Sequence, residues 1–540
     1  MKALLPAAAR ARQALPRPEL AATPGEPILF GNGLGGFSED GREYVITTGH
    51  DARTPAPWCN VIANPSFGCV VSESGSMVTW SENSQSHRLT PWSNDAVTDP
   101  SGEAIYLRDE EDGSVWSATP APAGGSRPYE VRHGQGYTLF THSHGGLEHE
   151  LCVLVDATDP VKICRLRLRN GGSRRRTLSV CGTVEWVLGN SRDRSRLTVV
   201  TAWDQARNAL LAWNPFSVFP EHRAFFLATR PVSSFTADRE EIFGRSGSRS
   251  RPAALDRVAL SGRSGPGLDP AGALLVPMSV APGETVEIAF VLGEGKDLEQ
   301  ALALCAIHAS PARAEASLVA ARAVWDQLLG TIKVKTPSVE LDLLLNRWLL
   351  YQALSSRLWA RSAFYQSGGA YGFRDQLQDV LALLHARPSL AREHILRSAE
   401  RQFVEGDVQH WWHAETGEGV RTRCSDDLLW LPYVTAEYVR ATGDGGILDE
   451  VIPFLDQRML EDGEHDVFAA PKRSSESASL YEHCTRAIDA GTTHGPHGLP
   501  LMRAGDWNDG MNRIGEGGTG ESIWLGWFLA KTLNDFTPLA

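Results

Sequence analysis

The sequence predicts a β-sandwich followed by an all-α domain, and three observations lead to that prediction. The chain has 540 residues, more than one hydrophobic core normally organises, so at least two domains are expected. In the first half, Gly, Pro and Ser recur at short intervals between segments whose apolar and polar residues alternate. In the second half, apolar residues recur every three or four positions, as they do along one face of a helix.

The predicted sandwich covers residues 31–293. Segments such as GYTLFTHSH, LEHELCVLV and VKICRLRLRN have the length and turn-rich flanks of antiparallel strands. In the third of these, which begins at Val161, the apolar residues come close to a period of two, with a slip at Cys164. The preceding residues, 1–30, hold a short apolar run broken by arginines and prolines, so we expect a linker or flexible arm there.

Residues 294–335 are rich in Ala and Leu and predict one or two linker helices, and residues 336–540 predict the all-α domain. Its first helix is expected to have Thr336 as N-cap and Pro337 at the first helical position. An apolar stripe at helical spacing follows at Leu341, Leu344, Leu345, Trp348 and Leu349. Further helices are expected in RDQLQDVLALLHA, SLAREHILRSAERQF, DDLLWLPYVTAEYVRATG and ESIWLGWFLAKTL. The loops between them are rich in Gly, His, Trp and acidic residues, which suits an all-α toroid whose loops line a central cleft.

Composition excludes several classes of protein. The net charge of −13 disfavours binding to nucleic acid or to an anionic membrane, and no apolar run approaches the length of a membrane-spanning helix. The eight cysteines are scattered without a CxxC pair, which favours buried thiols in a reducing compartment and a cytoplasmic location.

Two kinds of short motif match a dinucleotide-binding or a metal-binding pattern, but only weakly. GNGLGG at residues 31–36 matches the dinucleotide-binding pattern GxGxxG, but a turn and a strand follow it instead of a helix, so a Gly-rich turn is the better interpretation. The spacings His410/His413 and His494/His497 lack an HExxH frame and sit in Gly- or Trp-rich loops, so polar histidines that line the cleft are a better interpretation than a metal site. No GxSxG elbow or Walker motif is present.

The most informative stretch is RAGDWNDGMNRIG at residues 503–515. Its two acids, Asp506 and Asp509, flank Trp507, and glycines around them let a ligand approach the backbone closely. The indole offers a flat apolar wall for a pyranose ring, and a carboxyl desolvated beside it would gain a higher pKa and suit general acid catalysis. The alternative interpretation is an Asx-turn with solvated carboxylates.

Two further loops favour a sugar-binding cleft. YGFRDQLQD places a guanidinium and carboxylates at the start of a helix, and such groups together hold sugar hydroxyls as donor and acceptor. QHWWHAETGEGVRTRCSDDLLW concentrates His, Trp, Arg and Asp side chains in one connection. As an alternative, Asp426 caps the following helix and Trp430 packs in the core.

These motifs resemble those of the inverting disaccharide phosphorylases, the cellobiose and chitobiose phosphorylase-like family formerly called glycosyltransferase family 36. The resemblance is strongest to the phosphorylase-like C-terminal region of cyclic β-1,2-glucan synthase. It rests on RSAFYQSGGAYGFRDQLQD, GDVQHWWHAETGEGVRTRCSDDLLWLP, LYEHCTRAI and GDWNDGMNRIG, and in the first half on GLGGFSEDGREYVI and RTPAPWCNVIANPSFGCVVSESG. It covers nearly the whole chain from about Gly31.

The resemblance implies a carbohydrate-binding β-sandwich, a helical linker, an (α/α)6 barrel and a C-terminal jelly roll. It further implies inverting phosphorolysis of a β-glucosidic bond to give α-glucose 1-phosphate, with inorganic phosphate as co-substrate and no cofactor. By position, Asp509 matches the general acid, Trp507 a sugar-contacting aromatic, Asp375 a residue that binds the non-reducing sugar, and Arg361 a phosphate-binding arginine. The other residues expected to bind substrate are Arg374, Gln378, Asp379, Trp411, His413, Arg421, Arg423 and Glu482.

The chain departs from the family in two respects. Gly369 stands where cellobiose phosphorylases carry another arginine, so sugar or linkage preference is expected to differ. From Thr336 onward the sequence is also too short for a complete barrel and jelly roll, so we expect a barrel truncated at its C-terminal side and weak activity of the isolated chain. The expected ligands are a β-glucan oligosaccharide, β-1,2-linked, and phosphate. The expected protein partner is a glucan synthase polypeptide or a second copy. A non-catalytic glucan-binding or chain-length-controlling module and an inverting hydrolase that uses water are the alternatives.

Overall fold

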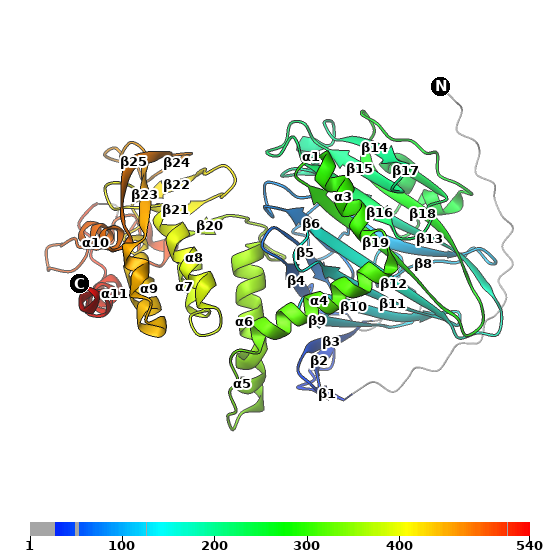
Figure 1. Cartoon of the computed structure of the whole chain (residues 1–540), viewed down its shortest axis with the longest axis horizontal. Coiled ribbons are helices and arrows are strands. Elements are labelled where there is room, and N and C mark those ends of the chain that lie inside the picture. Colours follow the sequence, from blue (N-terminus) through cyan, green and yellow to red (C-terminus); the bar gives the residue numbers. More distant parts are fainter. Residues whose placement is uncertain (1–26, 49–52, 126, 516) are drawn as a thin grey trace. The chain divides into compact units, whose positions relative to one another are not determined.

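The computed structural model describes residues 27–48, 53–125, 127–515 and 517–540, which form two compact units (Figure 1). The first unit contains the chain up to Gln327 together with Ser362–Gly368, and the second contains Leu328–Arg361 and Gly369–Ala540. Most of the N-terminal arm expected at residues 1–30 lies outside the described residues. Its last positions form strand β1 (Ile28–Leu29), which pairs with β2. No helix in the described ranges is long and apolar enough to cross a bilayer.

The first unit is built from antiparallel sheets. In the described part of the chain the largest sheet has eleven strands in the order β1-β2-β3-β9-β10-β11-β12-β19-β16-β15-β14, and a second has five in the order β17-β18-β13-β7-β8. The strands of the first are β1, β2 (Gly35–Ser38), β3 (Glu43–Thr48), β9 (Tyr129–Gly134), β10 (Tyr137–His144), β11 (Leu147–Val155), β12 (Val161–Asn170), β14 (Val200–Asp204), β15 (Ala209–Trp213), β16 (Arg223–Ala228) and β19 (Thr285–Gly295). Those of the second are β7 (Glu103–Asp109), β8 (Val115–Ser117), β13 (Arg176–Glu185), β17 (Ser234–Asp238) and β18 (Pro270–Val280). A three-stranded sheet holds β4 (Cys59–Ala63), β5 (Phe67–Ser72) and β6 (Met77–Ser81). Two short helices lie between strands, α1 (Arg192–Ser195) after β13 and α2 (Arg239–Phe243) after β17.

The core of the sandwich is formed by inward-facing side chains of both large sheets. Leu151 and Leu166 from the first sheet belong to one buried cluster with Val180 and Val276 from the second. Alternate residues of the long strands β11, β12, β13, β18 and β19 supply this layer, as expected where two sheets pack face to face. The Gly-rich segment 31–36 leads into the β2–β3 hairpin, as the turn interpretation predicted.

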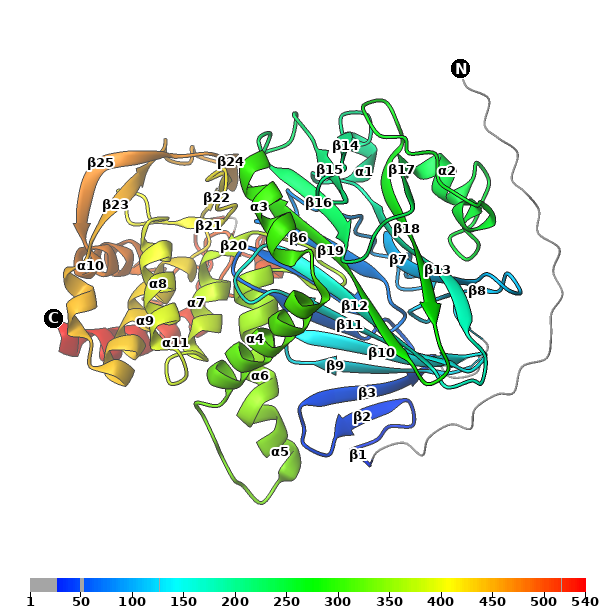
Figure 2. The same ribbon diagram turned by 45° about the vertical axis from the view of Figure 1, so that its right-hand side comes forward.

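Strand β12 buries both of its faces, which explains the slip that its sequence shows at Cys164. Cys164 and Leu166 point into the sandwich core, whereas Val161 and Ile163 point to the opposite side. On that side they pack against two helices, α3 (Leu298–His308) and α4 (Pro311–Leu329), in which Leu304 and Leu318 are buried. The predicted linker therefore consists of two helices that cover one face of the large sheet (Figure 2).

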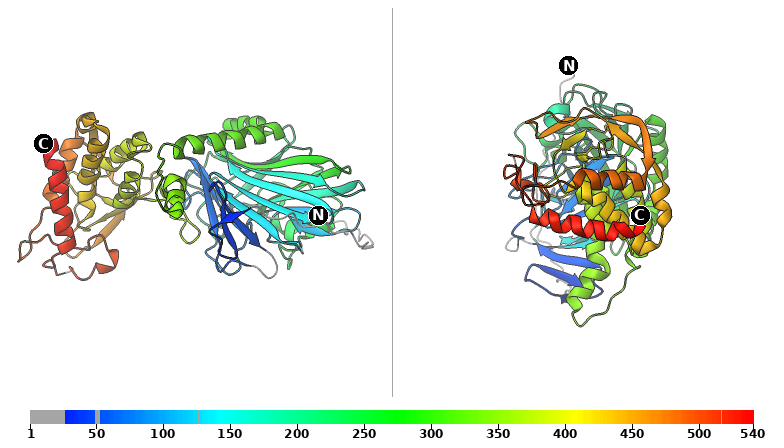
Figure 3. Two further views of the ribbon diagram at one scale, coloured as in Figure 1. Left: turned by 90° about the horizontal axis from the view of Figure 1, so that it is seen from below. Right: turned by 90° about the vertical axis from the view of Figure 1, so that its left-hand side faces the viewer.

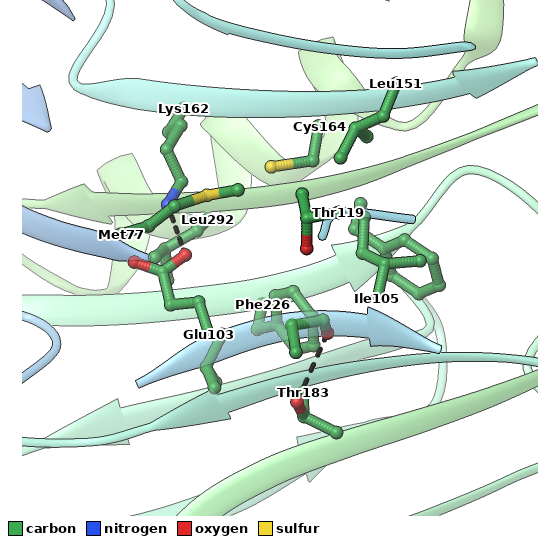
Figure 4. A pocket seen from close by; sticks show the side chains of 13 residues that line it. Met77, Glu103, Ile105, Thr119, Leu151, Lys162, Cys164, Thr183, Phe226 and Leu292 are labelled. Carbon is green, nitrogen blue, oxygen red and sulfur yellow. Dashed lines mark hydrogen bonds and ion pairs between the residues drawn. The ribbon is translucent and has the colours of Figure 1, made fainter. Parts of the chain in front are cut away.

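One charged pair lies inside the sandwich beside a small cavity of about 20 Å³ (Figure 4). Lys162, which has no exposed side-chain surface, donates to Glu103 and, over 2.7 Å, to the hydroxyl of Thr79. Glu103 also accepts from Thr79 at 2.6 Å and from Thr90 at 2.8 Å. Both charges are thus paired and hydrogen-bonded, which is the condition for tolerating them in a core.

The second unit is mainly helical. Its helices are α5 (Val339–Leu343), α6 (Leu349–Gln352), α7 (Phe373–Leu381), α8 (Pro388–Ala399), α9 (Asp427–Thr442), α10 (Leu480–Gly491) and α11 (Ile523–Phe536), and π-helical turns at Leu344–Trp348 and Ala353–Ala360 join α5 and α6 into one longer helix. Helix α9 packs against α7, α8, α10 and α11 (Figure 3). A sandwich followed by a helical domain confirms the fold class that the sequence predicted.

The first helix of this unit differs from the prediction in two details. Its N-cap is Ser338, whose hydroxyl accepts from the backbone N–H of Leu341, and Thr336 instead exchanges hydrogen bonds with Ser338. The two-residue shift arises because Pro337 precedes the capping hydroxyl rather than following it. Of the predicted apolar stripe only Trp348 is buried, and the four leucines are partly exposed.

Short strands occupy part of what the sequence predicted as loops. Strands β20 (Tyr371–Gly372), β21 (Gln409–Trp412), β22 (Gly419–Thr422) and β24 (Asp466–Ala469) form one sheet, and β23 (Val451–Asp456) pairs with β25 (Lys472–Ser479). The segment QHWWHAETGEGVRT is therefore a hairpin rather than an irregular connection. A hairpin fixes which side its alternate side chains face, and this matters for the site below.

Candidate functional site

Arg374 is the centre of the candidate site. It lies in the first turn of α7, and its buried guanidinium bonds groups from two other segments of the same unit. Its Nη1 lies 3.2 and 3.4 Å from the two carboxylate oxygens of Asp426, and its Nη2 lies 2.6 Å from Oδ1 of Asp509. Nη1 also donates to the backbone carbonyl of Asp506 over 3.1 Å. One cation therefore connects α7 to the segment before α9 and to residues 503–515, the Asp509 loop.

Backbone bonds hold these two acidic segments together. Both the N–H and the hydroxyl of Ser425 donate to the carbonyl of Gly505, at 2.9 and 3.0 Å, and Cys424 forms a β-bridge with Arg503. Gly505 has a φ of 140°, a conformation that favours glycine. The glycine of RAGDWNDG thus lets the Asp509 loop bend back onto the segment that carries Asp426.

Asp509 is placed differently from what the sequence suggested. It begins a 3₁₀ turn, Asp509–Met511, and its side chain is 62% exposed rather than desolvated beside an indole. Among the described residues, Arg374 is the side chain that bonds its carboxylate. The carboxyl is therefore aimed by an arginine and open to solvent on its other side, where a ligand can reach it.

The residues around Asp509 have distinct roles in the loop. Trp507 is 52% exposed, and its Nε1 lies 3.3 Å from Oε1 of Gln378, so its ring stands at the surface beside α7. Asp506 is buried and accepts from the hydroxyl of Ser522 at 2.7 Å and from the N–H of Asn508 at 3.1 Å. These bonds make Asp506 a structural anchor of the loop, while Trp507 and Asp509 present their side chains outward.

Helix α7 carries two more carboxylates toward Arg357. The Nε of Arg357 lies 2.9 Å from a carboxylate oxygen of Asp379, and the Nη2 of Arg357 lies 3.8 Å from one of Asp375. Burial raises the pKa of Asp379 to about 6 even though Arg357 acts to lower it. Gln378 stands between the two acids in sequence and bonds Trp507, so the sugar-binding candidates of α7 and the Trp507 wall lie together. No sequence motif pointed to Arg357, which lies in the π-helical turn Ala353–Ala360 before α7.

Asp426 and Asp427 form a buried pair of acids at the start of α9. Asp426 stands at the N-cap position of α9, but its side chain makes no capping hydrogen bond; its carboxylate accepts from Arg374 and, at 3.1 Å, from Nε1 of Trp430. Burial, together with the neighbouring charge of Asp427, raises the pKa of Asp426 to about 7. Asp427 accepts from Nδ1 of His410 at 2.7 Å. Burial acts to lower the pKa of His410, but Asp427 outweighs it and raises the pKa to about 9.

His410 and Asp427 thus belong to the site although sequence reasoning gave them no catalytic or binding role. The available signal was two consecutive acids directly before an apolar helix, with a histidine one hairpin upstream. That pattern did not show that strand β21 would bring the histidine back to the helix start.

The two arginines of the hairpin are used inside the protein. Arg421 is 1% exposed and makes a two-point contact of 2.6 and 2.7 Å with Asp407. Its Nη1 also donates to the backbone carbonyls of Gln457 and Arg458. Arg423 donates to the carbonyls of Leu460 and Glu461. Trp411 packs against His413 and Phe468. A role of these residues in binding substrate stays a prediction.

Arg361 and Glu482 also have protein partners. Arg361 has a left-handed backbone with φ 47°, and its guanidinium donates to the carbonyl of Gly369 at 2.9 Å and stacks over the ring of Tyr371 at 4.2 Å. Glu482 lies in the first turn of α10 and pairs with Arg486 at 3.0 Å. None of these contacts reaches Arg374, Asp426 or Asp509. The phosphate-binding role of Arg361 and the substrate-binding role of Glu482 therefore stay predictions.

Within the ranges that the structure describes, no group of possible metal ligands contains both histidines of either HxxH pair. His410 pairs with Asp427, whereas His497 pairs with Glu521 at 2.8 Å. The sulfur of Cys424 lies within 4.8 Å of the His410–Asp427 pair, but burial raises the pKa of this thiol to about 12, so it is protonated. The arrangement is a hydrogen-bonded ion pair with a neutral thiol beside it. All eight cysteines of the chain are free.

Comparison with known proteins places the chain in a family. Residues 42–311 match the glycosyl hydrolase 94 supersandwich domain, and residues 324–540 match the catalytic domain of the glycosyl hydrolase 94 superfamily. Cyclic beta-(1,2)-glucan synthase NdvB of Rhizobium meliloti (strain 1021) is 46% identical over 525 residues, which are 96% of this chain and 18% of that protein. N,N'-diacetylchitobiose phosphorylase of Vibrio proteolyticus is 27% identical over 94% of this chain and 64% of its own length.

A third relative is shorter in overlap. The 1,2-beta-oligoglucan phosphorylase of Listeria innocua serovar 6a is 25% identical over 42% of this chain and 20% of its own length. The chain therefore spans less than two thirds of each of these relatives. With both domain models matched in order along its length, the chain belongs to the glycosyl hydrolase 94 family.

Proposed function

We propose that this chain carries out inverting phosphorolysis of β-glucosidic bonds, or the reverse synthesis, as part of a glycoside phosphorylase. In this reaction Asp509 donates a proton to the glycosidic oxygen as its bond to C1 breaks. An oxygen of inorganic phosphate bonds C1 from the opposite face, which gives α-glucose 1-phosphate and a glucan shortened by one unit. The proton that hydrogen phosphate loses restores the acid, so the cycle needs no cofactor.

The contact between Arg374 and Asp509 is the observation that carries the proposal. It aims an exposed carboxyl beside the surface of Trp507, and a pyranose stacked on that ring would bring its glycosidic oxygen close to the acid. A sugar held there would also cover the exposed side of Asp509. Asp375, Gln378 and Asp379 would then bind hydroxyl groups of the same sugar.

The phosphate would be held by arginine. Arg361 is the candidate by family position, and a guanidinium suits bidentate contact with phosphate. In this structure its Nε and Nη1 bond backbone carbonyls and Tyr371, so phosphate contact through these two atoms would require the Arg361 side chain to exchange those partners. That exchange is part of the proposal.

β-1,2-Linked gluco-oligosaccharides are the proposed substrate. The 46% identical relative is called a cyclic beta-(1,2)-glucan synthase, and another relative is called a 1,2-beta-oligoglucan phosphorylase. The protein partner proposed on the same basis is a glucan synthase polypeptide, with self-association as the alternative. A glucan-binding or chain-length-controlling module remains the second candidate function, because the Trp507 surface serves binding equally well.

The deciding experiment incubates the chain, and the full-length protein that contains it, with β-1,2-gluco-oligosaccharides and phosphate. Release of glucose 1-phosphate is followed by a coupled assay, and proton NMR identifies the anomer. Phosphate-dependent α-glucose 1-phosphate supports the proposal. Free reducing sugar without phosphate would indicate a hydrolase, and glucan binding without turnover a binding module.

A further inference from the structure

Arg374 is shared between two carboxylates, one in the interior and one exposed. Its Nη1 serves Asp426 and its Nη2 serves Asp509. The Asp426 bond ties the guanidinium to the protein interior, while the Asp509 bond aims the candidate acid. A stronger pull from the interior would weaken the contact with Asp509, since one guanidinium cannot move toward both.

The interior side contains more negative charge than Arg374 alone can neutralise. Asp426 and Asp427 are neighbours with almost no exposed surface, and Oδ1 of Asp427 is buried without a hydrogen-bond partner in the part of the chain that the structure describes. A buried carboxylate left without a counter-charge is costly. Of the residues described, the cation that pairs with Asp427 is His410, whose Nδ1 donates to Asp427 over 2.7 Å.

The groups that face His410 are few and come from three segments. Asp427 starts α9, Arg374 lies in α7, and Asp509 lies in the Asp509 loop; the charges of all three act on the imidazole. Cys424 adds a thiol that is neutral at ordinary pH. The two carboxylates favour the imidazolium and Arg374 opposes it, with Asp427 the strongest of the three.

We propose that His410 is a positioning residue of the site: as an imidazolium it neutralises Asp427, and so leaves Arg374 free to hold Asp509 in place. This role deepens the proposed function and rests on it for its catalytic consequence. The ion pair itself is independent of any reaction. If His410 loses its proton or its charge, Asp427 becomes an unpaired buried anion, Arg374 is drawn toward the acid pair, and Asp509 loses its partner.

The first test measures the ion pair directly and needs no activity. In the full chain labelled with ¹⁵N-histidine, the His410 resonance is assigned by its disappearance in His410→Gln. We expect it to titrate with a midpoint near 9, and in Asp427→Asn we expect the midpoint to fall below the ordinary histidine value of about 6.5, because burial and Arg374 then dominate. An unchanged midpoint in Asp427→Asn, or a wild-type midpoint at or below the ordinary value, would overturn the proposal.

The second test measures the consequence for catalysis in the full-length protein. Phosphorolysis by the wild type should fall as pH rises through about 9, whereas His410→Gln, which keeps a donor but lacks the charge, should already be less active at neutral pH and should show no fall near 9. The matched control is His385→Gln, an exposed histidine in the α7–α8 loop, which should keep the wild-type profile. An identical profile for His410→Gln and wild type would contradict the positioning role.

A double variant separates charge compensation from a general structural loss. His410→Gln with Asp427→Asn removes the anion together with the cation, so it should recover activity relative to His410→Gln alone. No recovery would mean that the histidine acts through packing, against the proposal. If no protein form releases sugar phosphate, the proposed function fails, while the NMR titration still decides the ion pair.

Discussion

The two units of this protein treat buried charge in opposite ways. In the sandwich, Lys162 and Glu103 are enclosed and satisfy each other with the help of two threonines. In the helical unit, Arg374 is equally buried but holds one acid in the interior and one that is 62% exposed. An enclosed pair can only fix structure, whereas a buried cation that aims an exposed carboxyl leaves a group able to react.

The same contrast exists within the helical unit. Arg421 and Arg374 are both buried arginines close to the Trp-rich hairpin, and family position suggested both as substrate contacts. Arg421 directs its donors to Asp407, Glu405 and backbone carbonyls. Arg374 alone of the two reaches an exposed acid, so the comparison predicts which arginine affects chemistry and which affects stability.

The largest effect is expected for Asp509→Asn. Loss of general acid help should reduce phosphorolysis of β-1,2-gluco-oligosaccharides by roughly 10²–10⁴-fold. The melting temperature should change little, because the side chain is mostly exposed and Asn can still accept from Arg374. Initial rates and a thermal melt on the same samples check both halves. Near-normal turnover by this variant would move the acid elsewhere.

Breaking the enclosed Lys162–Glu103 pair should lower the stability of the sandwich instead of the catalytic rate. Lys162→Met leaves Glu103 as a buried unpaired charge and should lower the free energy of unfolding of the sandwich by about 3–5 kcal/mol. Replacing both partners, Lys162→Met with Glu103→Leu, should restore most of that loss, because no charge then remains in the core. Urea unfolding followed by circular dichroism compares the three proteins. A double variant no more stable than the single one would show that the cavity, not the charge, limits the core.

The order of the domains and most of the elements could be predicted from the sequence, because alternation and helical spacing reflect which face is buried. Strand β12 shows where this fails. Its slip at Cys164 is the mark of two buried faces, and the covering helices α3 and α4 come from more than a hundred residues further along. Period alone cannot show a partner that tertiary packing brings from such a distance.

The site shows the same limit. The acids, Trp507 and Arg374 were identifiable from residue types and family motifs, but their contacts were not. The neighbouring Trp507 suggested a desolvated Asp509, and the structure instead exposes Asp509 beside an arginine. His410 and Asp427 join only because a hairpin returns the chain to the start of α9, a geometry set by strand pairing with β22 and β24.

Arg421→Lys sharpens the comparison of the two arginines. Lysine cannot reproduce the two-point contact with Asp407 and the bonds to two carbonyls together, so the helical unit should lose about 2–4 kcal/mol of stability. The KM for glucan of the remaining folded enzyme should be unchanged. A higher KM without loss of stability would support the substrate-binding role suggested by family position.

The smallest expected effect concerns Asp379, whose side chain is 20% exposed and so lies between the enclosed Glu103 and the exposed Asp509. Burial raises its pKa to about 6, whereas an unfolded aspartate titrates near 3.8. Between these values the folded protein holds a proton that the unfolded chain has released, so the free energy of unfolding must fall as pH rises through this window. The size is of order 1–3 kcal/mol for a shift of this kind. Asp379→Asn removes the titrating group, and its stability should be flatter between pH 4 and 6 than that of the wild type when both are unfolded in urea across that range. Equal slopes for the two proteins would show that Arg357 keeps Asp379 ionised, and Asp379 would then belong with the paired charges of the interior instead of with the open group at Asp509.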